Sequence, residues 1–394
     1  MQPLDFDCID PQYRLWLTDY LLAYGFDPVA FCAAPQPAED EMFFKALLPN
    51  LDGDRNIGGF KFIEATMRHY DAVHQIADQM FGGFEGVSSL LDFASGYGRL
   101  TRALVQRMPI ERLWISDIYA DAVAWQAETF DVNTFVSVAN PTELDHAQKH
   151  DIVFVGSLFS HLPADLFRAW LARLYAMLTP TGILAFSTHD PSLLPDGELM
   201  DESGIRFFRW SESGSLDPDI YGMAYVTDAF VADAVARVDS GARCRHFPKG
   251  LYENQVLYVV ARPEVDLSVL AVASPPLGGF ETATLLADGS VDFAGWAIER
   301  TPGRTLCVQV EINGRSAGEA SVITDRPDIQ PTFPASPTPP FGWRFRLSRE
   351  QASAGAMIRV TMASSSGLKT FAYAAMPSDP ALTYSGWSRR ALRR

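Results

Sequence analysis

The segment with the most chemical information is LLDFASGYG, which spans residues 90–98. An apolar run typical of a buried strand ends there in an acid and turns through small residues into a helix. Small residues allow a backbone to approach a bound cofactor closely, and a helix N-terminus presents free N–H groups. We therefore expect the following residues to contact a cofactor: Asp92, Ala94, Ser95, Gly96 and Gly98.

A second acid, Asp117, closes the next apolar run, 21 residues after Gly96. Nucleotide-binding α/β folds hold at this place the acid that accepts hydrogen bonds from ribose hydroxyls. We expect Asp117 and its neighbour Ile118 to belong to the same cofactor site. A dinucleotide fingerprint would read G-x-G-x-x-G without an acid at the end of the strand. Since the small residues here are spaced by two, an NAD-dependent oxidoreductase is the disfavoured alternative.

The elements that must position these residues follow from hydrophobic patterning. Short apolar runs alternate with stretches of helical periodicity, the clearest of which covers residues 164–178. Such runs are typical of parallel strands buried on both faces. Five repeats of this alternation predict a doubly wound α/β sheet. The expected strands cover residues 89–93, 113–116, 134–138, 152–155 and 183–187, and a final antiparallel strand covers 253–260.

The regions on either side of this α/β pattern differ from it in their hydrophobic patterning. Residues 1–60 predict an N-terminal helical extension, and residues 61–262 hold the α/β domain with a long insertion at 191–219. Residues 263–380 predict a small all-β domain, sandwich-like, with a hairpin at Asn313-Gly314, because Asn-Gly favours tight hairpins. The expected strands of this domain cover residues 291–298, 307–312, 341–347 and 357–362. A short basic tail follows the domain at residues 381–394.

At the glycine loop the sequence resembles class I S-adenosylmethionine-dependent methyltransferases, whose signature is acid-x-Gly-x-Gly-x-Gly. Asp117, the segment DIVFVGSLFSHL at 151–162 and the segment LTPTGIL at 178–184 add to the resemblance, which covers about residues 88–262. It implies a Rossmann-like methyltransferase sheet and S-adenosylmethionine as cofactor. One departure is Ala94, which stands where the family has its first glycine. Since alanine favours negative φ, we expect the loop to accommodate a negative φ there.

The resemblance also implies roles for individual residues. The loop from Ala94 to Gly98 would contact the methionine moiety of the cofactor, and Asp117 would bind its ribose. Asn140 would approach the adenine, and Gly156 and Ser157 would lie beside the cofactor at the end of the fourth strand. Such an enzyme would methylate a hydroxyl of a small molecule or a glycan by in-line displacement. No Asn/Asp-Pro-Pro-aromatic motif follows the fourth strand, so the resemblance to methyltransferases that act on bases or glutamine is lacking.

Transfer to a hydroxyl benefits from a general base. The candidates that follow strand ends are His161 after the fourth strand, and His189 with Asp190 after the fifth, where ligands bind in open α/β sheets. A helix-entry role for His161 and a loop-structural role for the other two are the alternatives. A catalytically silent binding or scaffold protein that keeps the fold is the second hypothesis for function, motivated by Ala94 and the absence of an unambiguous base.

The all-β region resembles the small β domains found beside transferases in bacterial glycan assembly. The residues that carry this resemblance are Gly295-Trp296-Ala297, Asn313-Gly314, residues 325–329 and Phe341-Gly342-Trp343. Their aromatic side chains could stack on sugars, although core packing is the default expectation for such residues.

Charge and composition limit the partners. The chain of 394 residues has 32 Lys and Arg against 48 Asp and Glu, a net charge of -16, and residues 1–262 alone carry a net -17. This acidity argues against nucleic acid and favours a neutral or cationic acceptor. The four cysteines lie far apart, without spacing suited to a metal, and no apolar run is long enough to insert stably in a membrane. We expect a cytoplasmic protein; its oligomeric state is not indicated.

Overall fold

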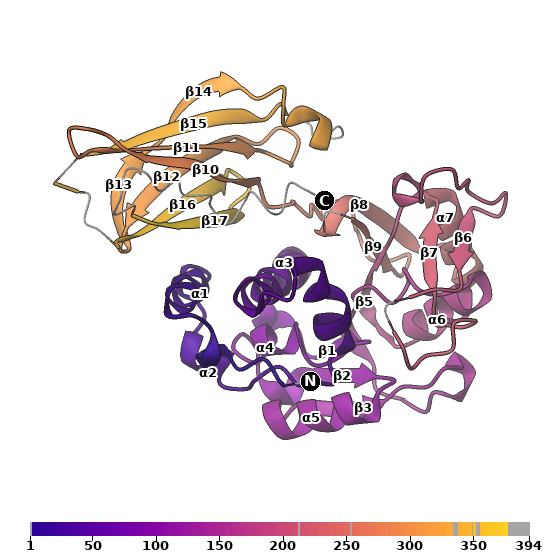
Figure 1. Ribbon diagram of the computed structural model, residues 1–394. Coiled ribbons are helices and arrows are strands. Elements are labelled where there is room, and N and C mark those ends of the chain that lie inside the picture. The colour runs from indigo at the N-terminus through magenta and orange to yellow at the C-terminus, as the bar shows by residue number, and fades with distance from the viewer. Residues whose placement is uncertain are drawn as a thin grey trace. The chain divides into compact units, whose positions relative to one another are not determined.

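The computed structural model describes residues 2–211, 213–252, 254–333, 338–348, 350–351 and 355–376. It divides into two compact units, Met1–Val272 and Ala273–Arg394 (Figure 1). The predicted basic tail at 381–394 lies outside the described residues. The domain boundary expected after residue 262 precedes this division, because the next residues pack on the first unit: Arg245 donates to the Leu267 carbonyl at 3.0 Å, and the Gln79 side chain accepts from the Ala271 N–H at 2.8 Å.

Helices and strands alternate through the first unit, as the sequence predicts. Its helices are α1 (Pro11–Ala23), α2 (Pro28–Cys32), α3 (Arg55–Phe81), α4 (Thr101–Leu104), α5 (Ala120–Phe130), α6 (Ala164–Ala176) and α7 (Asp228–Val238), with a π-helical turn at Met42–Leu47. Its strands are β1 (Leu90–Phe93), β2 (Leu113–Asp117), β3 (Asn133–Val136), β4 (His150–Val155), β5 (Leu178–Thr188), β6 (Ile205–Phe208), β7 (Met223–Val226), β8 (Arg243–Tyr252) and β9 (Gln255–Ala261).

The described residues form a seven-stranded sheet in the order β3-β2-β1-β4-β5-β9-β8. Strands β1 to β5 are parallel, and β9 runs antiparallel to both β5 and β8. This order brings the carboxyl ends of β1, β2 and β4 to one edge, where the predicted cofactor residues lie. The predicted doubly wound α/β sheet is confirmed.

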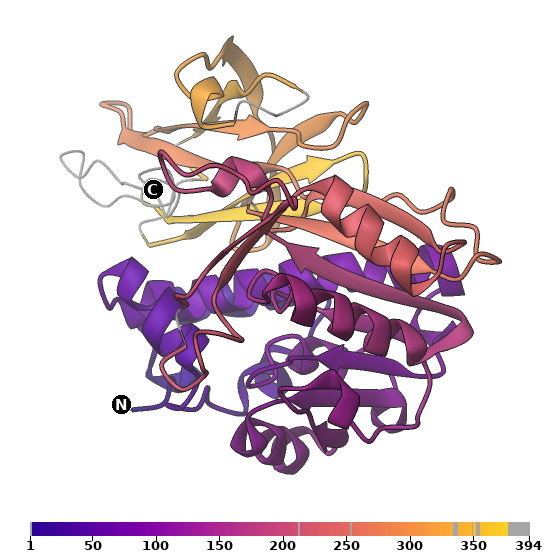
Figure 2. The same cartoon turned by 90° about the vertical axis from the view of Figure 1, so that its right-hand side faces the viewer.

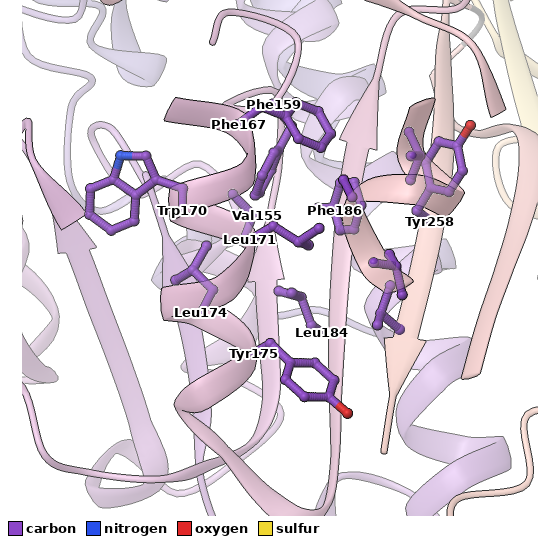
Figure 3. Close-up of a cluster of buried hydrophobic side chains, with 14 of the residues drawn as sticks. Val155, Phe159, Phe167, Trp170, Leu171, Leu174, Tyr175, Leu184, Phe186 and Tyr258 are labelled. Carbon is purple, nitrogen blue, oxygen red and sulfur yellow. The ribbon is translucent and has the colours of Figure 1, made fainter. Parts of the chain in front are cut away.

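A buried apolar cluster fixes α6 and α7 to one face of this sheet (Figure 3). Phe167, Trp170 and Leu171 of α6 pack with Val155 of β4 and Phe186 of β5, and each is at most 3% exposed. Fully burying a side chain of this kind contributes about 1.5–3 kcal/mol. Figures 1 and 2 show α3 and α4 on the opposite face, so that the sheet is covered on both sides.

Helix α3 is the element of the N-terminal region that matters most for the site. It begins at the N-cap Asp54, whose carboxylate accepts from the backbone N–H groups of Asn56 and Ile57, and it ends at Gly82 with a φ of +73°. Gly59, near the start of the helix, has no side chain, and the Ile9 side chain occupies this space: a β-carbon at Gly59 would lie 2.6 Å from it. The N-terminal extension therefore packs tightly on α3.

The insertion after β5 contains a feature that the sequence did not predict. Strands β6 and β7 form a separate antiparallel ribbon, in which Ile205 pairs with Val226 and Phe208 with Met223. Just before β7, the Gly222 N–H donates to the His161 carbonyl at 2.9 Å, so the start of the ribbon's second strand lies beside the segment that follows β4.

The described part of the second unit forms two four-stranded antiparallel sheets, ordered β10-β11-β15-β14 and β13-β12-β16-β17. The strands are β10 (Leu277–Leu285), β11 (Val291–Ile298), β12 (Leu306–Ile312), β13 (Arg315–Glu319), β14 (Ser321–Asp325), β15 (Phe341–Leu347), β16 (Met357–Ser364) and β17 (Lys369–Ala375). The predicted all-β domain is confirmed, with a core shared by both sheets. Trp343 and Trp296 are 0% and 3% exposed, so both pack inside the unit and present no ring for stacking on a sugar.

The hairpin predicted at Asn313-Gly314 joins β12 to β13, and both of its residues have positive φ, at +48° and +74°. Two left-handed residues in succession give the tight turn that matches the twist of paired strands. Of the other strands in this unit, β10, β13, β14 and β17 are not predicted by the sequence patterns.

Candidate active site

The chain leaves β1 through a loop that consists largely of left-handed residues. Ala94, Gly96 and Gly98 have φ values of +59°, +55° and +67°. A β-carbon at Gly98 would lie 2.9 Å from the Gln126 side-chain oxygen, whereas one at Gly96 would meet nothing within 4 Å. The expectation that Ala94 takes a negative φ is wrong, because the tight turn requires the left-handed conformation at this position whichever residue stands there.

The side chain of Gln126, on α5, forms hydrogen bonds to this loop. Its side-chain N–H donates to the Gly96 carbonyl at 2.7 Å and to the Ser95 hydroxyl at 2.8 Å, and its oxygen accepts from the Thr101 hydroxyl at 2.8 Å. The side chain is fully buried. Sequence reasoning missed Gln126, since a polar residue on a helix gives no sign that it faces a loop about 30 residues earlier.

Asp117 joins the end of β2 to the same loop. One carboxylate oxygen accepts from the Gly96 N–H at 2.7 Å, and the other accepts from the Tyr119 N–H at 3.0 Å. Burial raises the pKa of Asp117, while these backbone donors oppose the shift. Asp117 therefore contacts the loop after β1, as the sequence predicts. Its neighbour Ile118 lines the cavity described below.

Asp92, at the end of β1, is 4% exposed. Burial and the neighbouring Asp117 raise its pKa to about 8, and the guanidinium of Arg99 opposes this rise. The Asp92 side chain also lines the cavity described below.

The end of β4 lies next to α3. Ser157 has a φ of +65°, and its N–H donates to the Ser187 hydroxyl at 2.8 Å. A β-carbon at Gly156 would lie 2.8 Å from Nε2 of His69. The imidazole therefore occupies the space that a side chain at position 156 would need.

His69 comes from the middle of α3 and is 7% exposed. Its Nδ1 lies 3.2 Å from the Ala65 carbonyl, and its ring meets that of Phe154 edge-on at 5.6 Å. Burial and the guanidinium of Arg99 lower the pKa of His69 to about 3, so the ring is neutral at neutral pH. No sequence motif marks this histidine, because it precedes β1 and stands in an ordinary helical pattern.

A cavity of about 640 Å³ connects these groups. Its walls come from the loop after β1, the ends of β2 and β4, helix α3, residues 38–45 and the insertion. The lining residues used below are Glu39, Asp40, Glu41, His69, Asp92, Gly96, Arg99, Asp117, Tyr119, Val138, Gly156, Leu158, Ser213, Ser215 and Tyr221. Polar and apolar groups therefore face one continuous space beside the carboxyl ends of the strands.

The insertion is tied to the N-terminal segment across this cavity. The Tyr119 hydroxyl lies 2.9 Å from the Ser213 hydroxyl and 2.7 Å from that of Ser215. Glu41 accepts from the Gly214 N–H at 3.3 Å and from the Tyr119 hydroxyl at 3.4 Å. We call this group of hydrogen bonds, made by Glu41, Tyr119 and residues 213–215, the cover.

The residues predicted as general bases do not line the cavity. His161 is buried, its Nδ1 lies 2.6 Å from the Gly222 carbonyl, and its ring stacks on Tyr221 at 4.5 Å. His189 is buried beside it, and burial together with His161 lowers the pKa of His189 to about 4. Asp190 caps a short helix by accepting from the Ser192 N–H at 2.7 Å.

Asn140 lies one residue beyond the part of the chain that lines the cavity. Residues 137–139 belong to the wall, but the Asn140 side chain accepts from the Thr142 N–H at 3.2 Å and caps a short helix. Among the described residues, no group of three or more His, Cys, Asp or Glu could hold a metal ion. None of the helices described is both long and apolar enough to cross a membrane.

Comparison with known proteins assigns a family to the core of the first unit. Residues 90–182 match the family model described as a methyltransferase domain. No curated protein sequence matches the chain. Solved structures that are similar include a complex of DhpI with S-adenosylhomocysteine (SAH), at 15% identity and a TM-score of 0.38, covering 63% of this chain and 98% of that one.

Two further similar structures are DesVI from Streptomyces venezuelae and a SAM-bound amino pentose methyltransferase from Micromonospora echinaspora. The first is 16% identical with a TM-score of 0.39, covering 52% of this chain and 95% of that one. The second is 18% identical with a TM-score of 0.37, covering 50% and 91%.

The family match spans β1 to β4 and the first residues of β5, and it includes the loop after β1 and the acid that ends β2. This region is a class I S-adenosylmethionine-dependent methyltransferase domain. The first unit accordingly contains a methyltransferase domain.

Proposed function

We propose that this protein transfers the methyl group of S-adenosylmethionine to a hydroxyl group of a small molecule or a glycan. The observation that carries the proposal is the cavity, which joins the loop after β1 and Asp117 to a polar region under the cover. One part of the space suits the cofactor, and the other suits a polar acceptor.

The residues at the edge of the sheet fit S-adenosylmethionine. Gly96 leaves open space beside its backbone, as a closely bound ligand requires. Asp117 would bind the ribose hydroxyls, and the loop from Ala94 to Gly98 would contact the methionine moiety. Apolar side chains at Ile118, Val138 and Leu158 would face the adenine, with Gly156 and Ser157 beside the reacting group.

Positioning is the main contribution that the chain makes to an in-line displacement. The cofactor supplies an activated methyl group when bound, and the chain must align an acceptor oxygen with it. The acceptor side of the cavity carries the carboxyl groups of Glu39, Asp40 and Glu41, with the Lys45 ammonium paired to Glu41. A neutral or cationic acceptor is compatible with this charge.

Calorimetry with SAH tests the cofactor site. We expect Asp117→Ala to weaken SAH binding at least tenfold, since a buried carboxylate that accepts from a hydroxyl contributes about 1.5–3 kcal/mol. The exposed Asp145→Ala is the matched control and should bind as the wild type does. Thermal unfolding of each variant separates lost binding from lost fold. Wild-type affinity in a folded Asp117→Ala protein would refute the assignment.

A further inference from the structure

The walls of the cavity differ in how firmly they are held. The loop after β1 is fixed by the buried side chain of Gln126 and by the carboxylate of Asp117. The hydrogen bonds of the cover, in contrast, join residues that are exposed or half-exposed, namely Glu41, Tyr119, Ser213, Gly214 and Ser215. A segment held by exposed hydrogen bonds opens more readily than one held in the core. The cover is therefore the part of the wall that opens at the lowest cost.

The tip of the insertion, residues 213–216, is built as a small unit. The Ser213 hydroxyl accepts from the Leu216 N–H at 3.2 Å, which closes a turn within the tip. Arg209 and Asp219, which stand on either side of the tip in the chain, form an ion pair with each other. The tip can thus move as one piece while the two strands that carry it, β6 and β7, stay paired.

Tyr119 connects this tip to the cofactor side of the cavity. Its hydroxyl lies 2.9 Å from that of Ser213 and 2.7 Å from that of Ser215. Its backbone N–H donates to the Asp117 carboxylate at 3.0 Å. One residue therefore holds the insertion through its side chain and is itself held by the acid at the end of β2.

We propose that residues 213–216 form a lid over the cavity and that the Tyr119 hydroxyl is its latch. This inference rests on the proposed function, because the cofactor assigned there is the ligand that passes the lid. The lid opens when the Tyr119 hydroxyl and the two serine hydroxyls exchange their mutual hydrogen bonds for bonds to water. Because every bond of the cover joins two parts of the chain, opening costs the same free energy for entry of a ligand as for its exit.

Stopped-flow binding of SAH tests the latch. Tyr119→Phe should raise the association and dissociation rate constants by the same factor, about tenfold for the lost hydroxyl bonds, and should leave Kd within about twofold. The double variant Ser213→Ala/Ser215→Ala removes the same bonds from the side of the lid and should behave alike. Tyr175→Phe, which loses a bond to Asp239 outside the cavity lining, is the matched control and should bind as the wild type does.

A second measurement needs no ligand. Hydrogen–deuterium exchange of the amides at 213–216 should be about tenfold faster in Tyr119→Phe than in the wild type, and exchange in β6 and β7 should be unchanged. Wild-type exchange at the tip, wild-type rate constants for SAH, or a dissociation rate constant that rises alone in a folded variant would overturn the inference. Failure of the wild type to bind SAH would instead refute the proposed function, and the exchange rates would then decide whether the tip is a lid.

Discussion

Ala94 is the residue of the site whose conformation conflicts most with its type. Its φ of +59° places its β-carbon close to the following carbonyl oxygen, at a cost of about 1–2 kcal/mol. The neighbouring glycines adopt similar angles without this cost. The strain is tolerated because Gln126 and Asp117 both form hydrogen bonds to the backbone of Gly96, two residues further along the loop.

Ala94→Gly should therefore stabilise the protein. Relief of the left-handed strain, less about 0.4–1 kcal/mol for the greater freedom of glycine in the unfolded chain, leaves a net gain of about 0.5–1 kcal/mol. Urea unfolding measures this change. Ala124→Gly, at an exposed position inside α5, should instead destabilise the protein by about 1 kcal/mol. A destabilised Ala94→Gly protein would show that the methyl group contributes packing that outweighs the strain.

Residues that follow strand ends could be predicted from the sequence, and residues that reach the site from elsewhere could not. Asp92, Asp117 and Gly156 line the cavity as expected, because the spacing of strands and loops fixes which residues stand at that edge. His69 was missed because it belongs to a helix before β1, and only packing brings it to the end of β4. His161 follows β4 as expected, but its ring turns toward the Gly222 carbonyl.

Helix α5 connects the loop after β1 to the rest of the domain. Gln126→Leu keeps the size of the side chain and removes every hydrogen bond to the loop. We expect SAH affinity to fall about tenfold, because the unpaired Gly96 carbonyl and a looser loop cost roughly 1–3 kcal/mol. Thr101→Val, which removes only the bond that steadies Gln126, should have a smaller effect. Calorimetry distinguishes the two, and equal affinities for wild type and Gln126→Leu would contradict this role of α5.

Elements with strong periodicity were predicted closely. Helix α6 begins at the predicted residue, Ala164, and ends at Ala176, two residues before the predicted end. The five parallel strands lie within a few residues of the predicted runs, except that β5 begins earlier, at Leu178. The ribbon of β6 and β7 was missed because its strands are short and bounded by loop-like sequence. Strands β13 and β14 were missed for another reason: both are short, and the side chains of β13 are polar or small, so no apolar alternation marks them.

At the scale of the molecule, each unit has its own core and the cavity is lined by the first unit alone. The chain truncated after Val272 should therefore fold and bind SAH with the affinity of the full chain, within about twofold. Calorimetry and a cooperative urea transition test this expectation together. A truncated protein that folds but binds SAH much more weakly would mean that the second unit contributes to the cofactor site.

The place of β9 in the sheet has a consequence for how the protein is made. This strand lies between β5 and β8, yet it is the last of the seven to be synthesised. At about 5–20 residues per second, the loop after β1 leaves the ribosome roughly tens of seconds before β9 does. The residues that line the cavity, the last of which is Tyr221, are thus all synthesised before the sheet is complete. In the interval the edge of β5 is unpaired, and an unpaired strand edge can pair with another chain.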